Sequence, residues 1–315
     1  MPGPFHCDLA PGTQVSTLLR ILNTCWRKSC AWITDRSTWN SIRLESVAIS
    51  SSDISIPQGI EDNMNVKPQE ILSKVPEVTL GFWIIKILAT TLGETGGDAV
   101  SMSMNLGYLV STGIFATIFI VAVLAQISAK KFYPALYWTT IIASTTVGTT
   151  LADFADRSLG IGYPGGTAIL LTLLLGSLFL WFRTLGSIAV DSVNSPKSEL
   201  FYWITIMFSQ TLGTALGDWT ADSAGLGYSG GVILFCVLLG AIALAYFRTK
   251  ISRTILFWAA FVLTRPLGAV VGDLLDKPVS SGGMALSRYS ASAVLVLLIL
   301  TCILLLRQKP ATQEH

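Results

Sequence analysis

From about residue 78 onward, long apolar stretches of the chain alternate with short polar ones. Each apolar stretch is long enough for a helix that crosses roughly 30 Å of hydrocarbon, which takes about 20 residues. The eight stretches lie near residues 78–99, 107–127, 133–154, 166–183, 200–220, 231–247, 254–275 and 289–306. This pattern predicts an all-α integral membrane protein with eight transmembrane helices, whose main partner is the lipid bilayer.

The first part of the chain has a different character. Residues 1 to about 75 are rich in Ser, Asp and Asn and show no sustained apolar period. They also lack the basic and apolar regions of a signal peptide. We therefore expect residues 1–75 to be a disordered N-terminal extension. The alternative is that translation begins at Met64, because the residues after it resemble a cytoplasmic start ahead of a first membrane helix.

The apolar part contains four copies of one motif: FWIIKILATTLGETGGD, YWTTIIASTTVGTTLAD, YWITIMFSQTLGTALGD and FWAAFVLTRPLGAVVGD. Self-similarity of this kind indicates a repeat architecture. We expect repeats at residues 76–132, 133–198, 199–252 and 253–306, followed by a cytoplasmic tail at 307–315. Each repeat has an even number of helices, so all four enter the membrane in the same direction and are parallel repeats.

Three residue types recur in register. A glycine follows the tryptophan of each copy after ten residues, an aspartate after fifteen and a second glycine after twenty-four. In chain order, the tryptophans are Trp83, Trp138, Trp203 and Trp258, the first glycines are Gly93, Gly148, Gly213 and Gly268, and the aspartates are Asp98, Asp153, Asp218 and Asp273. The tryptophan spacings of 55, 65 and 55 residues suggest two pseudo-symmetric halves of two repeats each.

Helical geometry gathers the polar residues of each repeat on one face. At 100° per residue, the positions 7, 11, 15 and 18 residues after the tryptophan share its face. The candidate substrate or ion-binding residues at these positions are Glu94, Asp98, Asp153, Asp156, Asp218, Asp273, Asp276 and Arg265, with Asp222 one residue after the last position in the third repeat. The opposite face carries apolar residues that we expect to meet lipid while the polar face turns into the bundle: Ile85, Leu88, Leu92, Phe208, Leu212, Leu263, Leu267 and Val271.

The tryptophans and the first glycines are assigned to packing and to the membrane interface. Trp is enriched at membrane interfaces whatever a protein does. The first glycines lie on the flank of the polar face, where small residues let helix backbones approach closely. Lys86, one turn into the first predicted helix, is expected to extend its amine to the cytoplasmic surface.

The aspartates carry the strongest functional signal, because a carboxylate within a membrane helix is costly unless it is paired, protonated or facing water. One hypothesis is a ring of up to four carboxylates, with Glu94 one turn deeper, that attracts cations or relays protons. A metal held by oxygen alone would be Mg²⁺, Mn²⁺, Ca²⁺ or Na⁺ rather than zinc or copper. The alternative is structural: each aspartate caps a helix or pairs with a neighbour such as Arg265.

Composition excludes several classes of protein. Of the 315 residues, 51% are hydrophobic and only 13% are charged, against roughly 25% charged in soluble domains. The net charge of +2 is too small to indicate nucleic-acid binding. His6 and His315 lie at the two ends of the chain, which excludes a histidine-based triad in the membrane body. No cofactor and no enzymatic activity are predicted, and the sequence leaves the oligomeric state open.

The distribution of basic residues predicts the orientation. One set of loops carries Lys130, Lys131, Arg183, Lys197, Arg248, Lys250, Arg253, Arg307 and Lys309. The opposite loops carry only Arg157, Lys277 and Arg288. Basic loops stay in the cytoplasm. Both termini are therefore expected to be cytoplasmic.

Four tandem copies, each with two predicted spans and a characteristic tryptophan, resemble a family of bacterial integral membrane proteins defined by a repeat of unknown function. The resemblance covers about residues 77–306 and does not include residues 1–63. It implies an eight-span protein of the bacterial inner membrane. It implies no activity.

Two classes of function remain open. The first is a transporter or exporter of a small cation, such as a metal ion, with or without proton coupling. The second is a membrane scaffold or sensor subunit in which the same carboxylates only hold the repeats together. The presence of Arg265 in the fourth repeat favours transport, because a symmetric structural role has little need of it.

Overall fold

A computed structural model describes residues 73–311 of the chain. The predicted disordered extension, apart from its last three residues, and the predicted start at Met64 lie outside this range. The described part is helical, with eight α-helices joined by short turns and shorter helical segments. In chain order they are α2 (Leu80–Asp98), α3 (Gly107–Ser128), α4 (Pro134–Asp153), α5 (Tyr163–Leu185), α6 (Pro196–Asp218), α7 (Gly227–Arg248), α8 (Arg253–Asp276) and α9 (Arg288–Leu305).

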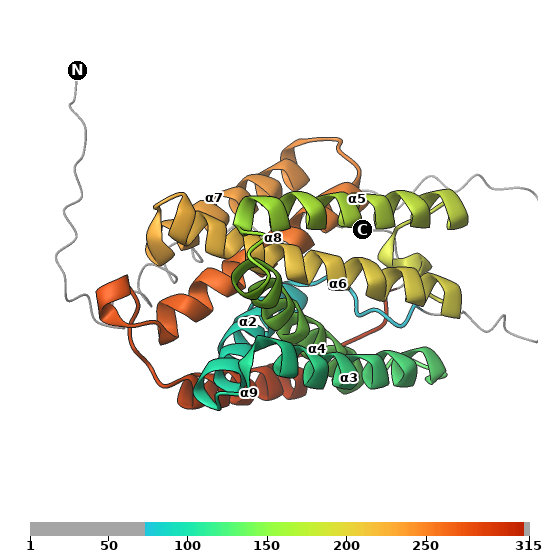
Figure 1. The fold of residues 1–315 in the computed structure, drawn as a ribbon. Coiled ribbons are helices and arrows are strands. Elements are labelled where there is room, and N and C mark those ends of the chain that lie inside the picture. Colours follow the sequence, from blue (N-terminus) through green and yellow to red (C-terminus); the bar gives the residue numbers. More distant parts are fainter. Residues whose placement is uncertain (1–72, 312–315) are drawn as a thin grey trace, which may run out of the picture. The chain divides into compact units, whose positions relative to one another are not determined.

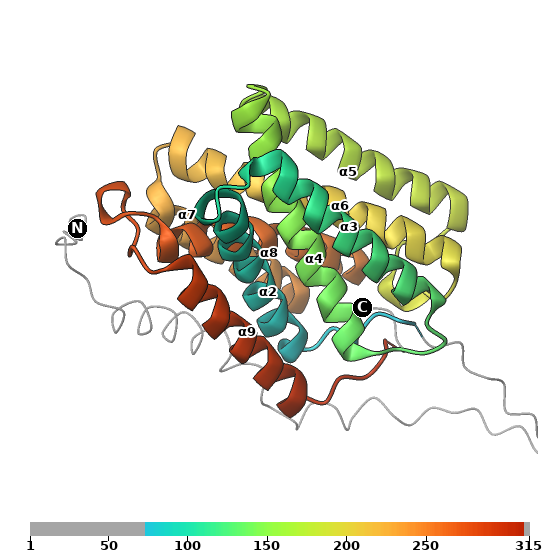
Figure 2. The same ribbon diagram turned by 60° about the horizontal axis from the view of Figure 1, so that its bottom comes forward.

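The first helices of the four repeats form a closed inner ring. Helix α2 packs on α4, α4 on α6, α6 on α8, and α8 returns to α2. The second helix of each repeat lies outside this ring and covers the first helix of the next repeat: α3 covers α4, α5 covers α6, α7 covers α8, and α9 covers α2 (Figures 1 and 2). Packing therefore follows a fourfold cycle. It does not divide the bundle into the two halves that the tryptophan spacing suggests, because α4 packs on α6 much as α2 packs on α4.

Close approach within the inner ring depends on glycine. The first glycine of each repeat faces the residue seven positions after the tryptophan of the next repeat: Gly93 faces Thr145, Gly148 faces Gln210, Gly213 faces Arg265, and Gly268 faces Thr90. A methyl group on Gly268 would lie 2.2 Å from Thr90 Oγ1 and 2.8 Å from its backbone carbonyl carbon. Any larger residue at these crossings would push the helices apart.

The outer helices give the molecule an apolar surface. Within the described range, α3, α5, α7, α8 and α9 are long and apolar enough to cross a membrane by length and composition. Large side chains such as Leu109, Phe179 and Val237 on the outer helices are exposed. A surface of this kind marks a membrane-embedded protein.

The predicted lipid-facing surface of the inner helices is wrong for four of its eight residues, whereas Leu88, Phe208, Leu263 and Val271 are partly exposed. Ile85 is fully buried, and Leu92, Leu212 and Leu267 are also buried. The reason is that each inner helix is covered on its apolar side by an outer helix of the preceding repeat, which the periodicity of a single helix cannot show.

Aromatic residues close one end of the inner ring. The aromatic residue before each tryptophan contacts the tryptophan of the next repeat: Phe82 contacts Trp138, Tyr137 contacts Trp203, Tyr202 contacts Trp258, and Phe257 contacts Trp83. These eight residues are called the aromatic layer below. Tyr137 and Tyr202 also share a hydrogen bond of 2.6 Å between their hydroxyl groups. This layer fills the axis of the ring at the end that carries both ends of the described chain.

Connecting segments cover the aromatic layer from outside. Ser73 Oγ donates to Val190 O at 2.7 Å, and Ala311 N donates to Val75 O at 2.8 Å. Ser73 and Val75 are buried. These last residues of the predicted N-terminal extension are thus ordered and packed, contrary to the prediction for 1–75, because they fill the space between the linker at 186–195 and the C-terminal segment.

At the other end, the turns that lead to the outer helices depend on the second glycine of each repeat. Gly107, Gly162, Gly227 and Gly282 all have positive φ angles, between 63° and 83°. A side chain is disfavoured in this conformation. In the first three repeats, the aspartate is followed directly by one π-helical turn: Ala99–Ser103, Phe154–Ser158 and Trp219–Ser223. Such turns are frequent at functional sites.

Candidate functional site

The axis of the inner ring is lined by layers of side chains at four-residue intervals. Below the aromatic layer come Lys86, Ile141, Ile206 and Phe261, then Thr90, Thr145, Gln210 and Arg265, then Glu94, Thr149, Thr214 and Ala269, and finally Asp98, Asp153, Asp218 and Asp273. All of these side chains are buried. The axis therefore changes from aromatic at one end to acidic at the other. The four aspartates are called the acidic layer below.

Lys86 lies inside the ring and not at the surface. Its side chain is fully buried, and its amine lies 4.1 Å from the centre of the Phe261 ring. Lys86 Nζ has no hydrogen-bond partner among the described residues. The predicted extension to the cytoplasmic surface is wrong, because the aromatic layer and the segments over it close that route.

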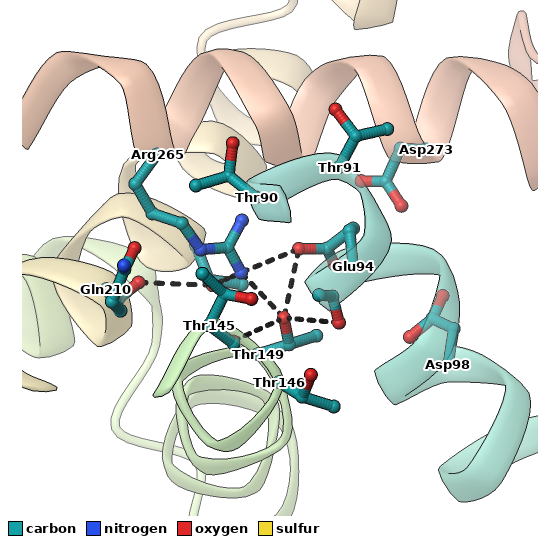
Figure 3. A network of polar contacts seen from close by, with 12 residues as sticks. Thr90, Thr91, Glu94, Asp98, Thr145, Thr146, Thr149, Gln210, Arg265 and Asp273 are labelled. Carbon is teal, nitrogen blue, oxygen red and sulfur yellow. Dashed lines mark hydrogen bonds and ion pairs between the residues drawn. The ribbon is translucent and has the colours of Figure 1, made fainter. Parts of the chain in front are cut away.

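Arg265 occupies the centre of the ring and links all four repeats. Its Nη2 donates to Thr149 Oγ1 at 2.6 Å and to Glu94 Oε2 at 3.0 Å (Figure 3). The same nitrogen donates to Thr214 Oγ1 at 2.5 Å. The side chain is fully buried. Arg265 Nε and Nη1 have no partner among the described residues. Arg265 thus pairs with Glu94, and not with an aspartate as the structural alternative supposed.

The acidic layer lies one turn beyond Glu94, and the fold brings carboxylates of different repeats together there. Carboxylate oxygens of Glu94, Asp218 and Asp273 lie within 4.8 Å of one another, and so do those of Asp98, Asp273 and Asp276. Figure 3 shows Asp98 and Asp273 on the same side of Glu94. All five carboxylates are buried. Oxygen ligands at such spacing suit a hard cation.

Two basic side chains divide the acidic layer into two pairs. Lys277 Nζ lies 2.5 Å from Asp98 Oδ2 and 3.0 Å from Asp273 Oδ1. On the other side of the ring, Arg157 Nε lies 2.8 Å from Asp153 Oδ1, and its Nη2 lies 3.4 Å from Asp218 Oδ2. Each basic residue bridges its own repeat and an adjacent one. We call these places the Lys277 site and the Arg157 site.

The Lys277 site contains a third carboxylate and a second cation. Asp276 Oδ2 accepts a hydrogen bond from Arg288 Nε at 2.7 Å, and Arg288 Nη2 lies 3.7 Å from Asp98 Oδ2. The remaining oxygens Asp98 Oδ1 and Asp276 Oδ1 are buried without a hydrogen-bond partner. In the Arg157 site, the residue equivalent to Asp276 is Asp156. It lies instead against α5, where a methyl group on Gly166 would come within 2.3 Å of its Oδ1.

The two bridging cations are held in their charged forms. Lys277 follows the end of α8. Burial lowers its pKa, but the carboxylates of Asp273, Asp98 and Asp276 outweigh burial and raise the pKa above its ordinary value. For Arg157, in the turn after α4, burial is likewise outweighed by Asp153 and Asp218. Both groups therefore act as permanent positive charges at neutral pH.

Not all of the predicted residues join the layer. Asp222 is exposed, and its Oδ2 accepts a hydrogen bond from the Tyr163 hydroxyl at 3.2 Å. It lies one residue beyond the position of Asp156 and Asp276 in their repeats, and this shift turns it to the surface. Asp156 is buried but points to α5.

The sequence did not identify Arg157, Lys277 and Arg288 as partners of the aspartates, and it placed Lys86 at the surface. Arg157 and Lys277 both stand four residues after the repeat aspartate, and both belong to even-numbered repeats. An ion pair between residues four apart on a helix is a common pattern. That spacing was therefore the signal for these two residues. No local signal placed Arg288 beside Asp98, because the two lie 190 residues apart in the chain.

Comparison with known proteins places the chain in a family. It matches the family described as a Repeat of Unknown Function (DUF347) four times, over residues 81–132, 136–187, 201–252 and 256–309. These matches cover well over half of the chain, and the protein belongs to this family. Searches of the curated proteins and of the solved structures found no match.

Proposed function

We propose that this protein is a membrane transporter of a small cation, which enters the inner ring from the acidic end. The observation that carries the proposal is an excess of buried negative charge. Seven buried carboxylates lie in and around the acidic layer: Glu94, Asp98, Asp153, Asp156, Asp218, Asp273 and Asp276. Within residues 73–311, four basic side chains pair with them: Arg157, Arg265, Lys277 and Arg288.

An excess of this kind is costly in a membrane protein. Burying an unpaired carboxylate is so unfavourable that the group takes up a proton or binds a cation instead. The fold keeps these carboxylates together from four repeats, where a purely structural bundle would be served by apolar residues of similar volume. Cation or proton uptake at the acidic layer explains why the charges are retained.

The rest of the axis supports a pathway that leads inward from the acidic layer. Hydroxyl, amide and charged groups continue from the acidic layer inward as far as Lys86, and the aromatic layer fills the axis beyond it. A transporter of this kind alternates between states that open to different sides. The structure resembles a state closed at the aromatic end.

Orientation follows from the basic residues. In our proposal all eight helices cross a bacterial inner membrane, and both termini are cytoplasmic. The nine basic residues of the prediction all belong to the aromatic end, whereas Arg157, Lys277 and Arg288 are engaged with carboxylates. The acidic layer then faces the outside of the cell. A reporter fused after Lys131 should be active only in the cytoplasm, and one fused near Ser280 only outside it.

The ion pairs favour a second candidate, a scaffold or sensor subunit without transport. Arg157 and Lys277 each pair with an aspartate of a neighbouring repeat as well as with one of their own. In this case the carboxylates would contribute to stability and to nothing else. The two candidates predict different effects of replacing Asp with Asn or Glu with Gln, which removes the charge and keeps the shape of the side chain. The transporter should lose flux, and the scaffold should lose stability.

The deciding experiment is a flux assay in proteoliposomes with Mg²⁺, Mn²⁺, Ca²⁺, Na⁺ and H⁺. The variants are Glu94→Gln and Asp218→Asn, with Asp222→Asn as the matched control because Asp222 is exposed and outside the acidic layer. We expect the first two to abolish flux and the control to retain it. Melting temperatures in detergent are measured in parallel. Loss of stability in the first two variants, in a protein that transports none of these ions, would support the scaffold instead.

A further inference from the structure

The two basic residues in the acidic layer hold equivalent places. Lys277 bridges the aspartates of repeats four and one, and Arg157 bridges those of repeats two and three. Half a turn about the ring axis takes repeats four and one to the places of repeats two and three, so the two sites join equivalent pairs of repeats. Differences between the two sites are therefore informative, because in each site the fold places one basic side chain between the aspartates of two neighbouring repeats.

The first difference is the bridging residue. Arg157 offers a planar group with several fixed donors, suited to a permanent bridge between two carboxylates. Lys277 offers a compact ammonium group on a flexible stem of four carbons. It stands at the end of α8, in the turn before Val279–Ser281, with its side chain 12% exposed. A flexible stem at the end of the helix allows the ammonium group to change position while the helix backbone stays in place.

The second difference is the number of carboxylates. The Arg157 site has two, whereas the Lys277 site has three within 4.8 Å: Asp98, Asp273 and Asp276. Two buried oxygens of the Lys277 site, Asp98 Oδ1 and Asp276 Oδ1, have no hydrogen-bond partner. Arg288 neutralises one of the three charges. Without the ammonium group, the Lys277 site would carry two negative charges.

We infer that the Lys277 site binds a divalent cation in exchange for the Lys277 ammonium group, which holds the place of the ion in its absence. Two negative charges match one divalent ion, and carboxylate oxygens suit Mg²⁺, Mn²⁺ or Ca²⁺. The Arg157 site, by contrast, stays closed as a structural bridge. This inference deepens the proposed transport function and rests on it for its physiological meaning, but binding itself can be measured separately.

The test is Mn²⁺ binding to the purified full-length protein in detergent, followed by the electron paramagnetic resonance signal of free Mn²⁺. Lys277→Met removes the tethered cation and keeps the length of the side chain. We expect it to tighten Mn²⁺ binding at least tenfold over wild type. The matched control is Arg157→Met, which should leave the affinity for Mn²⁺ within twofold of wild type. The double variant Lys277→Met, Asp276→Asn should lose at least half of the increase in the logarithm of the Mn²⁺ affinity that Lys277→Met produces.

A measurement on the wild-type protein covers the case in which a variant does not fold. If Mn²⁺ displaces the Lys277 ammonium group, Mn²⁺ should speed the reductive methylation of Lys277 at least threefold, as followed by mass spectrometry. Lys309, at the other end of the bundle, serves as the internal reference. Equal effects of Lys277→Met and Arg157→Met on Mn²⁺ affinity would overturn the inference, and so would an unchanged methylation rate.

Binding and transport can fail independently in these experiments. Tight Mn²⁺ binding that depends on Lys277, in a protein that moves no ion across proteoliposomes, would support the site and refute the transporter. Cation flux that is the same in wild type, Lys277→Met and Asp276→Asn would support the transporter and refute the site.

Discussion

The two ends of the inner ring are built from the same four helices and follow different symmetries. At the aromatic end, every repeat contributes an aromatic residue and a tryptophan, and the same contact between neighbours occurs four times. At the acidic end, every repeat contributes an aspartate, but the bridging cations come only from repeats two and four. The packing contacts are thus repeated four times around the ring, whereas the bridging cations occur twice.

The difference has a physical reason. Apolar contacts are not directional, so each of four equal repeats can make the same stabilising contact with its neighbour. Like charges around one axis repel each other, so four equal aspartates cannot all be buried without counter-charges. Differences between the repeats therefore supply the counter-charges: Arg157 and Lys277 beside the acidic layer, and Arg265 beside Glu94.

The largest expected effect comes from removing the central charge between the two ends. Arg265→Met takes away the bonds from one guanidinium nitrogen to three other repeats and leaves Glu94 buried without its partner. The free energy of unfolding should fall by about 3–5 kcal/mol. Adding Glu94→Gln should restore most of this loss. Thermal unfolding in detergent measures both, and a double variant no better than the single one would show that Arg265 acts through packing alone.

The next effect tests the fourfold packing itself. Gly268→Ala places a methyl group against Thr90 at the crossing of α8 and α2. Stability should fall by about 1–3 kcal/mol, as for other overpacked contacts. Gly240→Ala, in the outer helix α7, is the control, because no atom lies within 4 Å of the added methyl group. The control should be neutral or slightly stabilising, since alanine is the better helix former.

A smaller effect of opposite sign is expected at Lys86. Lys86→Met removes a fully buried amine that has no hydrogen-bond partner and keeps a chain of similar length. Relief of desolvation outweighs the lost contact with Phe261, so stability should rise by about 1–2 kcal/mol. If the melting temperature falls instead, the contact of the amine with the ring is worth more than its burial costs.

The smallest effect distinguishes the repeats within the aromatic layer. Tyr137→Phe removes one hydroxyl of the Tyr137–Tyr202 pair and leaves the other buried alone. We expect a loss of about 0.5–1.5 kcal/mol. Changing both tyrosines to phenylalanine reproduces the residue of repeats one and four and should lie closer to wild type. A double variant worse than the single one would show that the two hydroxyls have partners other than each other.

Much of the fold follows from the sequence because the motif is repeated. The eight helices lie at the positions that the apolar stretches predict, and the faces that carry the repeat aspartates turn inward as expected. Hydrophobic length and helical period are local properties, and four copies in register make each of them visible four times. The glycine ten residues after each tryptophan also marked the close crossings in advance.

Other features were decided by the tertiary structure alone. A single helix does not show that its apolar side will be covered by a helix of the preceding repeat, so Ile85 and Leu212 were assigned to lipid and are buried in protein. Nor does it show which charges meet. Glu94 pairs with Arg265, and Asp98 with Lys277 and Arg288, across separations of 171, 179 and 190 residues. Ion pairs depend on positions in space to within a few ångströms, and those positions are fixed only by the closure of the ring from α8 back to α2 and by the packing of α9 on α2.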